Sequence, residues 1–452
     1  MPPNHNSPTL YGHPKGLFVL FFTEMWERFS YYGMRALLVL YMTQHLLTRD
    51  ENDDSVLGLS PLRETLESFF GTLTPHALAS HIYGLYTGLV YFTPIFGGML
   101  ADRFLGARKT VISGAILMAI GHFLMASEAF FLLALLLLIV GNGCFKPNIS
   151  IQVGNLYPSG DPRRDSAFSL FYMGINLGAL FSPLVCGTLG QVYGWHYGFA
   201  AAGVGMTIGL ITFIGGQRYL AVERDVPNLP TRENRQPLTV KDWQAIFALS
   251  GLAVVNIMFW AVYEQQGNSL QLFADRRVDW QVLGWRIPST WFQAFNPILI
   301  LCLVPTINYF SRRSAAYLKP WSGLGKMALG ACLLGLSFIA LRVAIANVND
   351  AETINLAWLL LCTLVYTLGE LYLSPVGLSL VARIAPVKLG GMMMGIWFLS
   401  SFFGNYLSGY IGSYYEKMPN DSFFMLLASL GIGTGIAIMA FQPLLAKAIN
   451  VR

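Results

Sequence analysis

Long apolar segments follow one another along nearly the whole chain of 452 residues. A helix needs about 20 mostly apolar residues to cross a bilayer. Twelve segments meet that requirement: 16–46, 81–101, 108–127, 129–149, 166–190, 196–217, 243–268, 290–310, 322–347, 354–383, 388–415 and 422–446. Only 12% of the residues are charged, whereas soluble domains have about 25%. The sequence therefore predicts an all-α membrane protein with twelve transmembrane helices, surrounded by the lipid bilayer.

The lysines and arginines are unequally divided between the two sets of loops. With the N-terminus inside, the cytoplasmic segments hold 19 of these residues and the opposite segments hold 7. Positive charge is retained in the cytoplasm, and an even number of spans places both termini on the same side. We therefore expect a multi-pass protein of the cell inner membrane with both termini in the cytoplasm.

Two polar segments interrupt the apolar pattern. Residues 218–242 are rich in Pro and charge and predict a cytoplasmic linker between two six-helix bundles, 1–217 and 243–452. The longest outer loop, about 47–80, could contain a short amphipathic helix around 61–72, but its polar composition favours a solvated loop. The first apolar segment is too long and too charged for a cleavable signal, so we expect it to remain as the first span.

Several classes of function are disfavoured by composition. The net charge of +5 comes from short loops with no basic run, which argues against nucleic-acid binding. The five cysteines show no CxxC spacing, so neither a metal site nor a disulfide framework is indicated. The chain has no HExxH element and no GxSxG elbow, and we expect neither an enzyme nor a bound cofactor.

Seven ionisable residues lie in the parts of the predicted spans where the hydrocarbon core of the bilayer is expected. Left unpaired in lipid, at roughly 3 kcal/mol each, they would cost about 20 kcal/mol, so they must pair around a polar cavity. On the first span, steps of three and four residues place the charges and Tyr31 on one stripe and leave Trp26 and Phe29 on an apolar face. The seven residues are Glu24, Glu27, Arg28, Arg35, Lys146, Glu264 and Glu370.

Three bases and four acids in one cavity suit a zwitterionic ligand, with its carboxylate on Arg or Lys and its ammonium on Glu. Acids near bases also have a tunable proton affinity, which coupling to a proton gradient requires. For any single pair the alternative is a structural ion pair between helices. Helix breakers such as Pro147 and Pro375 lie at the same depth and could line a cavity, although a plain kink is commoner.

Four motifs resemble known transporter families. The loop Gly97-Gly98-Met-Leu-Ala-Asp102-Arg103 resembles the inter-helix signature of the major facilitator superfamily. Three further segments together resemble the proton-dependent oligopeptide transporter (POT, or PTR) family over essentially the whole chain. They are Glu24-Met-Trp-Glu27-Arg28-Phe-Ser-Tyr31-Tyr32-Gly33, Phe171-Tyr172-Met-Gly-Ile-Asn176-Leu-Gly178 and Phe259-Trp260-Ala-Val-Tyr-Glu264-Gln265.

The resemblance implies a role for each matching position. The family's ExxER element falls on Glu24, Glu27 and Arg28, which together with Glu264 are implicated in proton coupling. Arg35 and Glu264 match a salt bridge that closes the extracellular side, and Lys146 and Glu370 match the cytoplasmic pair. The implied peptide-binding residues are Arg28, Tyr31, Tyr32, Arg35, Tyr91, Lys146, Asn176, Trp260, Glu264, Asn296, Glu370, Trp397 and Ser401.

Some of these positions also have simpler explanations. Aromatic residues in membrane proteins are commonly interfacial or packing residues, and Gly33 and Gly178 could simply permit close helix contact. The segment 218–242 is too short and polar for the extra helix pair that many bacterial members carry. The span 2 histidine of mammalian members falls near Gly84, with His81 one turn away, so we assign proton handling to the carboxylates.

The sequence thus predicts a major-facilitator bundle that imports di- and tripeptides with protons by alternating access. Protons are the expected coupling ion, and a monomer is the default for this fold. A nitrate or other anion carrier on the same fold, a peptide receptor that does not transport, and a membrane enzyme remain as alternatives.

Overall fold

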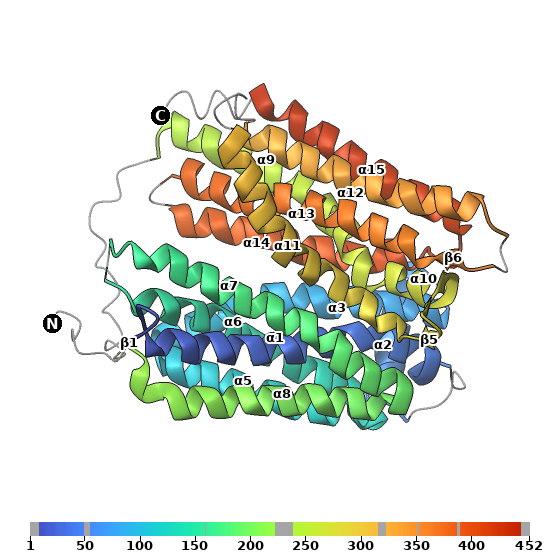
Figure 1. Ribbon diagram of the computed structural model, residues 1–452, viewed down its shortest axis with the longest axis horizontal. Helices are drawn as coiled ribbons and strands as arrows, with labels where there is room; N and C mark the ends of the chain where they lie inside the picture. Colours follow the sequence, from blue (N-terminus) through green and yellow to red (C-terminus); the bar gives the residue numbers. More distant parts are fainter. Residues whose placement is uncertain are drawn as a thin grey trace. The chain divides into compact units, whose positions relative to one another are not determined.

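A computed structural model describes residues 9–48, 55–158, 160–221, 238–314, 322–349, 352–386 and 389–443. The chain separates into two compact units that alternate along the sequence (Figure 1). Unit 1 comprises Met1–Leu73, Phe92–Thr231 and Thr290–Pro297, and unit 2 comprises Thr74–Tyr91, Arg232–Ser289 and Ile298–Arg452. Most of the predicted linker 218–242 lies outside the described residues, and the division into bundles at 217 and 243 stays a prediction.

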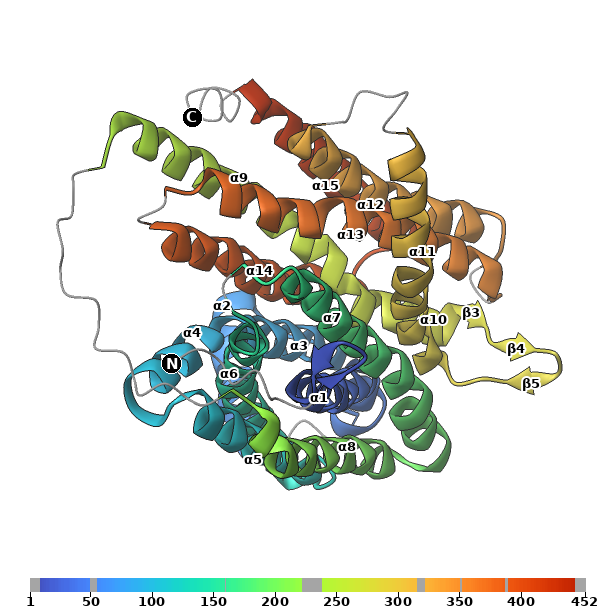
Figure 2. The same ribbon diagram turned by 60° about the vertical axis from the view of Figure 1, so that its left-hand side comes forward.

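Unit 1 is built around its first long helix. Seen end-on in Figure 2, α1 is surrounded by α5, α6, α7 and α8, with which it is in contact. The helices are α1 (Lys15–Tyr41), α2 (Leu59–Phe70), α4 (Pro94–Leu100), α5 (Ala107–Leu124), α6 (Phe131–Asn155), α7 (Arg163–Ser182) and α8 (Trp195–Gly216), and a short antiparallel pair joins β1 (Thr9–Leu10) to β2 (His13–Pro14). Stretches of π-helix extend three spans: Met42–Leu46 after α1, Ala101–Leu105 after α4, and Pro183–Gly187 and Leu189–Tyr193 after α7.

In unit 2, α12 packs against α13 and α15, and α14 packs against α9 (Figure 1). The helices are α3 (Pro75–Phe92), α9 (Val240–Tyr263), α10 (Ser269–Arg277), α11 (Phe292–Ser314), α12 (Gly323–Ala346), α13 (Leu356–Ile384), α14 (Gly390–Gly412) and α15 (Asn420–Ala440). The first turns of α11 are counted with unit 1. Short strand pairs cap the helices: β3 (Val278–Asp279) lies parallel to β6 (Ile354–Asn355), and β4 (Gln281–Val282) lies antiparallel to β5 (Trp285–Arg286).

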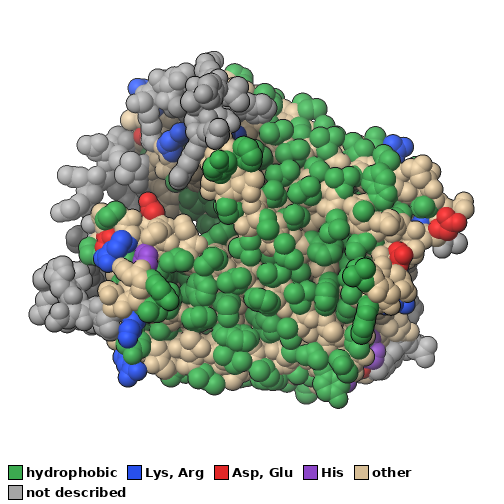
Figure 3. Space-filling model, in the orientation of Figure 1, with side chains coloured by type: hydrophobic (Ala, Val, Ile, Leu, Met, Phe, Trp, Pro, Cys, Tyr) green, Lys and Arg blue, Asp and Glu red, His purple; other side chains and the backbone are tan. Residues whose placement is uncertain are grey.

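Nine helical segments of the described chain are long and apolar enough to cross a membrane. They confirm a multi-pass helical membrane protein. Helices α1, α5 and α14 occupy the other three predicted positions, and the count of twelve spans stays a prediction. Over α7 and α8, the face drawn in Figure 3 is largely hydrophobic, and its charged side chains gather toward the helix ends. Helices α6 and α13 continue through Pro147 and Pro375.

The preference for a solvated loop around residues 61–72 is wrong, because the structure has helix α2 there. Its two ends are set by glycines: Gly58 precedes the helix with a φ of 82° and Gly71 follows it with a φ of 74°. Only glycine adopts such backbone angles without strain. Leu66 is buried, and this apolar contact stabilises a helix whose other residues are half-buried or exposed.

Candidate functional site

The predicted charged stripe on α1 forms a compact ionic cluster. Arg28 Nε donates to Glu24 Oε1 over 2.9 Å, one helical turn away, and lies 2.6 Å from Glu27 Oε2 as an ion pair. All three side chains are buried, and Glu27 has no exposed surface. Two carboxylates therefore share one guanidinium, and these three side chains are neutral together only with a second cation nearby or a proton on one carboxylate.

The cluster also has unused hydrogen-bonding capacity. Glu24 Oε2, Glu27 Oε2 and Arg28 Nη2 are buried and have no hydrogen-bond partner among the described residues. Buried polar groups in native structures are nearly always satisfied, so such exceptions call for a functional explanation. A guanidinium N–H can bind a carboxylate ligand, and a free carboxylate oxygen can accept a proton.

Helix α6 contributes two further polar side chains to this cluster. Asn142 Nδ2 donates to Glu27 Oε1 over 3.1 Å. Lys146 lies one turn further along α6 and acts electrostatically on Glu27. Sequence reasoning identified Lys146 but missed Asn142. The spacing of four residues between them, which places both on one face of a helix, was the signal that could have found it.

The aromatic part of the α1 stripe continues from the cluster. The Arg28 guanidinium carbon lies 5.6 Å from the centre of the Tyr31 ring, within the range of a cation–π contact. The Tyr31 and Tyr32 rings meet edge to face at 5.2 Å. Arg35 is buried one turn beyond Tyr31. The structure thus brings the predicted residues of α1 together with Asn142 and Lys146 in unit 1.

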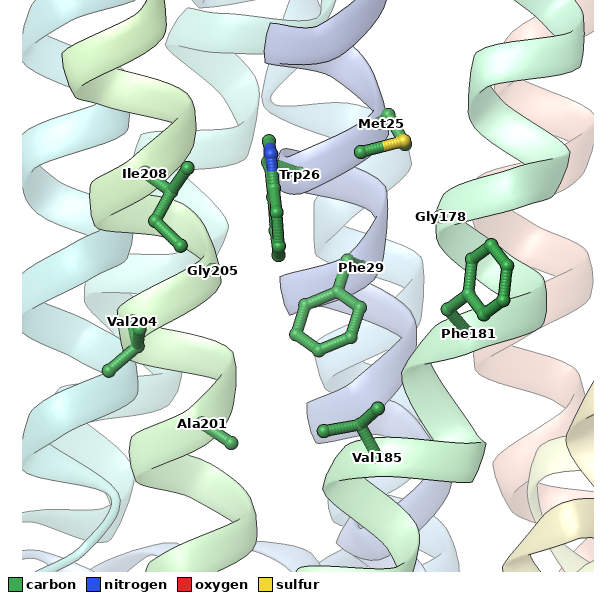
Figure 4. Close-up of a pocket in the computed structure, with 10 residues that line it drawn as sticks. All are labelled: Met25, Trp26, Phe29, Gly178, Phe181, Val185, Ala201, Val204, Gly205 and Ile208. Atoms are coloured by element: carbon green, nitrogen blue, oxygen red, sulfur yellow. The ribbon is translucent and has the colours of Figure 1, made fainter.

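The opposite side of α1 is apolar, as its sequence pattern predicts. Trp26 and Phe29 point into a pocket of about 610 Å³ between α1, α7 and α8, shown in Figure 4. The other lining residues are also apolar or glycine: Met25, Gly178, Phe181, Val185, Ala201, Val204, Gly205 and Ile208. A charged ligand gains nothing from such a lining, so the candidate site is the ionic cluster and not this pocket.

Glycines hold the stripe in place. A Cβ added to Gly178 of α7 would lie 2.3 Å from the Met25 carbonyl oxygen of α1, and one added to Gly33 would lie 2.6 Å from Cys186 Sγ. The interpretation of these two glycines as sites of close helix contact is confirmed. Asn176, predicted to bind peptide, is buried on α7 and donates to the Tyr172 carbonyl oxygen over 3.0 Å.

In unit 2, the predicted acid Glu264 lies where α9 ends and a 3₁₀ turn, Glu264–Gly267, begins. Its side chain is buried. Trp260, one turn earlier, meets the Tyr263 ring edge to face at 5.3 Å. Tyr263 in turn stacks on Tyr366 of α13 at 4.8 Å. These aromatic contacts fix the end of α9 and therefore the position of Glu264.

The other predicted residues of unit 2 lie on three helices. Glu370 is half-buried on α13, Trp397 and Ser401 are buried on α14, and Tyr91 is half-buried on α3. Asn296, at the start of α11, is buried in unit 1. The predicted pairs Arg35 with Glu264 and Lys146 with Glu370 each join residues of different units, and they stay predictions, as do the roles of all the site residues. The described residues contain no group of His, Cys, Asp or Glu arranged to hold a metal ion.

These features define a class of protein. Ionisable residues buried within membrane helices are costly and mark paths for ions or substrates. A multi-pass helical protein with such a cluster, backed by an apolar helix face, has the construction of a secondary transporter.

Comparison with known proteins gives the family. The sequence model of the POT family matches residues 108–240 and 231–430. An uncharacterized transporter, YclF, of Bacillus subtilis is 34% identical over 97% of this chain and 96% of its own. A di-/tripeptide transporter of Lactococcus lactis subsp. cremoris is 30% identical over 99% of both chains. A crystal structure of a peptide transporter POT in complex with alafosfalin superposes with a TM-score of 0.84 at 32% identity, covering 98% of this chain and 97% of that chain.

The chain therefore belongs to the POT family of transporters. Its fold is that of the major facilitator superfamily, to which the POT family belongs. The resemblance found in the motifs of the first, fifth and seventh spans is confirmed over almost the full length of the chain.

Proposed function

We propose that this protein imports di- and tripeptides together with protons by alternating access, and that it acts as a monomer in the cell inner membrane with both termini in the cytoplasm. The observation that carries the proposal is the Glu24–Arg28–Glu27 cluster, where two buried carboxylates share one guanidinium. Membership of the POT family and similarity to a di-/tripeptide transporter support the choice of peptide as cargo.

In this proposal, some of the site residues bind the proton and others bind the peptide. A proton on Glu27 neutralises that acid and leaves the Arg28 guanidinium to Glu24 and to the peptide carboxylate. Lys146 offers a second cation for that carboxylate, and Glu370 offers an anion for the peptide ammonium group. Glu264 and Arg35 form the proposed outer gate, which opens when Glu264 takes up a proton. Protons are the coupling ion, and neither a cofactor nor a metal is needed for this cycle.

The driving force is sufficient for accumulation. One charge crossing about 100 mV supplies about 2.3 kcal/mol, and one pH unit supplies about 1.4 kcal/mol. Together these energies sustain a concentration ratio of several hundred-fold for one proton per neutral peptide.

Uptake of labelled dialanine into liposomes under an inward proton gradient tests the proposal. We expect wild-type protein to accumulate peptide and both Glu27→Gln and Glu370→Gln to lose accumulation. Glu27→Gln should retain peptide exchange without a gradient, because glutamine imitates the protonated acid while leaving the peptide site intact. Folded wild-type protein that binds dialanine but does not accumulate it would overturn the proposal in favour of a receptor or another cargo.

Asp161 provides the matched control, since it is an acid outside the membrane-spanning helices. Arg163 Nε and Nη2 donate to its two carboxylate oxygens over 3.1 and 2.7 Å. These hydrogen bonds favour the ionised form and lower the pKa of Asp161 to about 2. Any stability that the pair contributes is therefore lost only as the pH falls toward 2, and Asp161 stays charged at transport pH. Asp161→Asn should accumulate dialanine with the wild-type pH dependence.

A further inference from the structure

A buried amide touches the proposed proton-binding acid. Asn142 lies in the middle of α6 with no exposed surface. Its Nδ2 donates to Glu27 Oε1 over 3.1 Å. The other oxygen of Glu27, Oε2, lies 2.6 Å from Arg28 Nε. The single hydrogen on Arg28 Nε is donated to Glu24. The hydrogen bond that Glu27 accepts from a side chain therefore comes from the amide of Asn142.

The rest of the Asn142 side chain is not satisfied. Its Oδ1 is buried and has no hydrogen-bond partner among the described residues. Burying an amide oxygen without a partner costs free energy that an apolar side chain of similar size does not incur. Leucine at this position would avoid that cost but would leave the buried Glu27 Oε1 without its donor. The hydrogen bond to Glu27 is what the asparagine adds.

The groups around Glu27 act on its protonation in opposite directions. Burial and the Glu24 carboxylate oppose the ionised form, whereas Arg28 and Lys146 favour it. An amide N–H donor can bond to a carboxylate but gains less from the protonated acid, so Asn142 adds to the side that favours ionisation.

We propose that Asn142 is a positioning residue that holds the Glu27 carboxylate in its ionised form and so sets the pH at which the carrier releases its proton. This inference rests on the proposed function, in which Glu27 carries the coupled proton. It gives Asn142 a role in the return half of the cycle, when Glu27 must lose its proton to the cytoplasm.

Asn142→Leu removes the donor and keeps the volume. Without the hydrogen bond the carrier holds its proton to higher pH, so the midpoint of proton-driven uptake should move upward by about one pH unit. The maximal rate of uptake should fall several-fold because proton release slows, while peptide exchange continues. Asn142→Asp, which replaces the donor with a third acid of the same size, should move the midpoint further in the same direction.

Asn148→Leu is the control on the same helix. Asn148 is also buried with an unpartnered Oδ1 among the described residues, but its Nδ2 donates only to the backbone oxygens of Cys144 and Gly97. Its loss should leave the pH midpoint unchanged. Thermal melting in detergent separates folding from function, because it shows whether Asn142→Leu and Asn148→Leu are both folded at the temperature of the uptake assay.

An infrared titration measures the protonation of Glu27 directly and does not depend on transport activity. The carboxyl band that disappears in Glu27→Gln reports the protonation of Glu27 in purified protein, and its midpoint should rise in Asn142→Leu. A raised midpoint supports the inference even if wild-type protein fails to accumulate peptide, a failure that would count against the proposed function alone. An unchanged midpoint in folded Asn142→Leu and Asn142→Asp overturns the inference.

Discussion

Two adjacent glycines in the middle of α4 differ sharply in their surroundings. A Cβ on Gly97 would lie 2.0 Å from the Gly143 carbonyl oxygen of α6, whereas a Cβ on Gly98 would meet nothing within 4 Å. Both belong to the glycine-containing motif of the sequence, but only the first permits close helix packing. The backbone of α6 cannot move aside as a flexible side chain would.

We therefore predict that Gly97→Ala destabilises the protein by about 1–3 kcal/mol through overpacking. Gly98→Ala should have no cost and could gain up to about 1 kcal/mol, because alanine is the better helix former. Thermal melting of the two purified variants in detergent checks this difference. Equal melting temperatures would show that α4 and α6 do not pack closely through Gly97.

At the residue scale, the charged stripe was predictable and its partner was not. Helical spacing alone placed Glu24, Glu27 and Arg28 on one face, because steps of three and four residues are fixed by helix geometry. The hydrogen bond from Asn142 depends on how α6 packs against α1, which no local pattern encodes. The four-residue spacing of Asn142 and Lys146 indicates only that both lie on one face of α6, and it does not indicate which residue of α1 that face meets.

At the element scale, the helices with long apolar segments were predictable, and the short polar one was not. Helix α2 has 12 residues, and only Leu66 among them is buried. An isolated helix of that length is marginal in water, so composition alone favoured a loop. Its bounds depend on backbone angles at Gly58 and Gly71, which the sequence permits but does not require.

Helix α9 begins with a capping box, and its contribution to the stability of the first turn can be tested. Thr239 Oγ1 accepts from the Asp242 backbone N–H over 3.2 Å, and the Asp242 carboxylate accepts from the Thr239 backbone N–H over 2.9 Å. Thr239→Ala should destabilise the first turn by about 1 kcal/mol, seen as roughly five-fold faster amide exchange there. Thr239→Ser keeps the hydroxyl and should exchange like wild type. Equal exchange in all three proteins would mean that the box does not fix the start of α9.

At the scale of the whole molecule, hydropathy and charge gave the class, but a hydropathy criterion alone leaves out three of the predicted spans, among them the one that holds the ionic cluster. Glu24, Glu27, Arg28 and Arg35 lower the hydropathy of α1, which is not among the nine helices that qualify by composition. Helix α1 is predicted to be a span only when its charged residues are recognised as lying on one face that points away from the lipid. The relation between residues of different units, such as Lys146 and Glu370, is not encoded in either pattern.

The proposed cytoplasmic position of both termini gives a prediction at the scale of the whole molecule. Green fluorescent protein folds in the cytoplasm, so a fusion at the C-terminus should fluoresce. A fusion after Lys417, which lacks α15, should be dark because its end lies on the opposite side. The reverse pattern would contradict the orientation derived from the loop charges.

The contacts of α1 limit how it can move during transport. Gly178 of α7 and Gly205 of α8 leave no room for a Cβ against the Met25 oxygen and the Phe29 ring, so both neighbours grip the helix on its apolar side. Turning α1 about its own axis would break these close contacts and move the buried Glu27 away from its partners Arg28 and Asn142 and toward the apolar lining of α7 and α8, where a charge is costly. We therefore expect α1, α7 and α8 to move together as one rigid group in any transport cycle, with α1 keeping its orientation about its own axis relative to the other two helices.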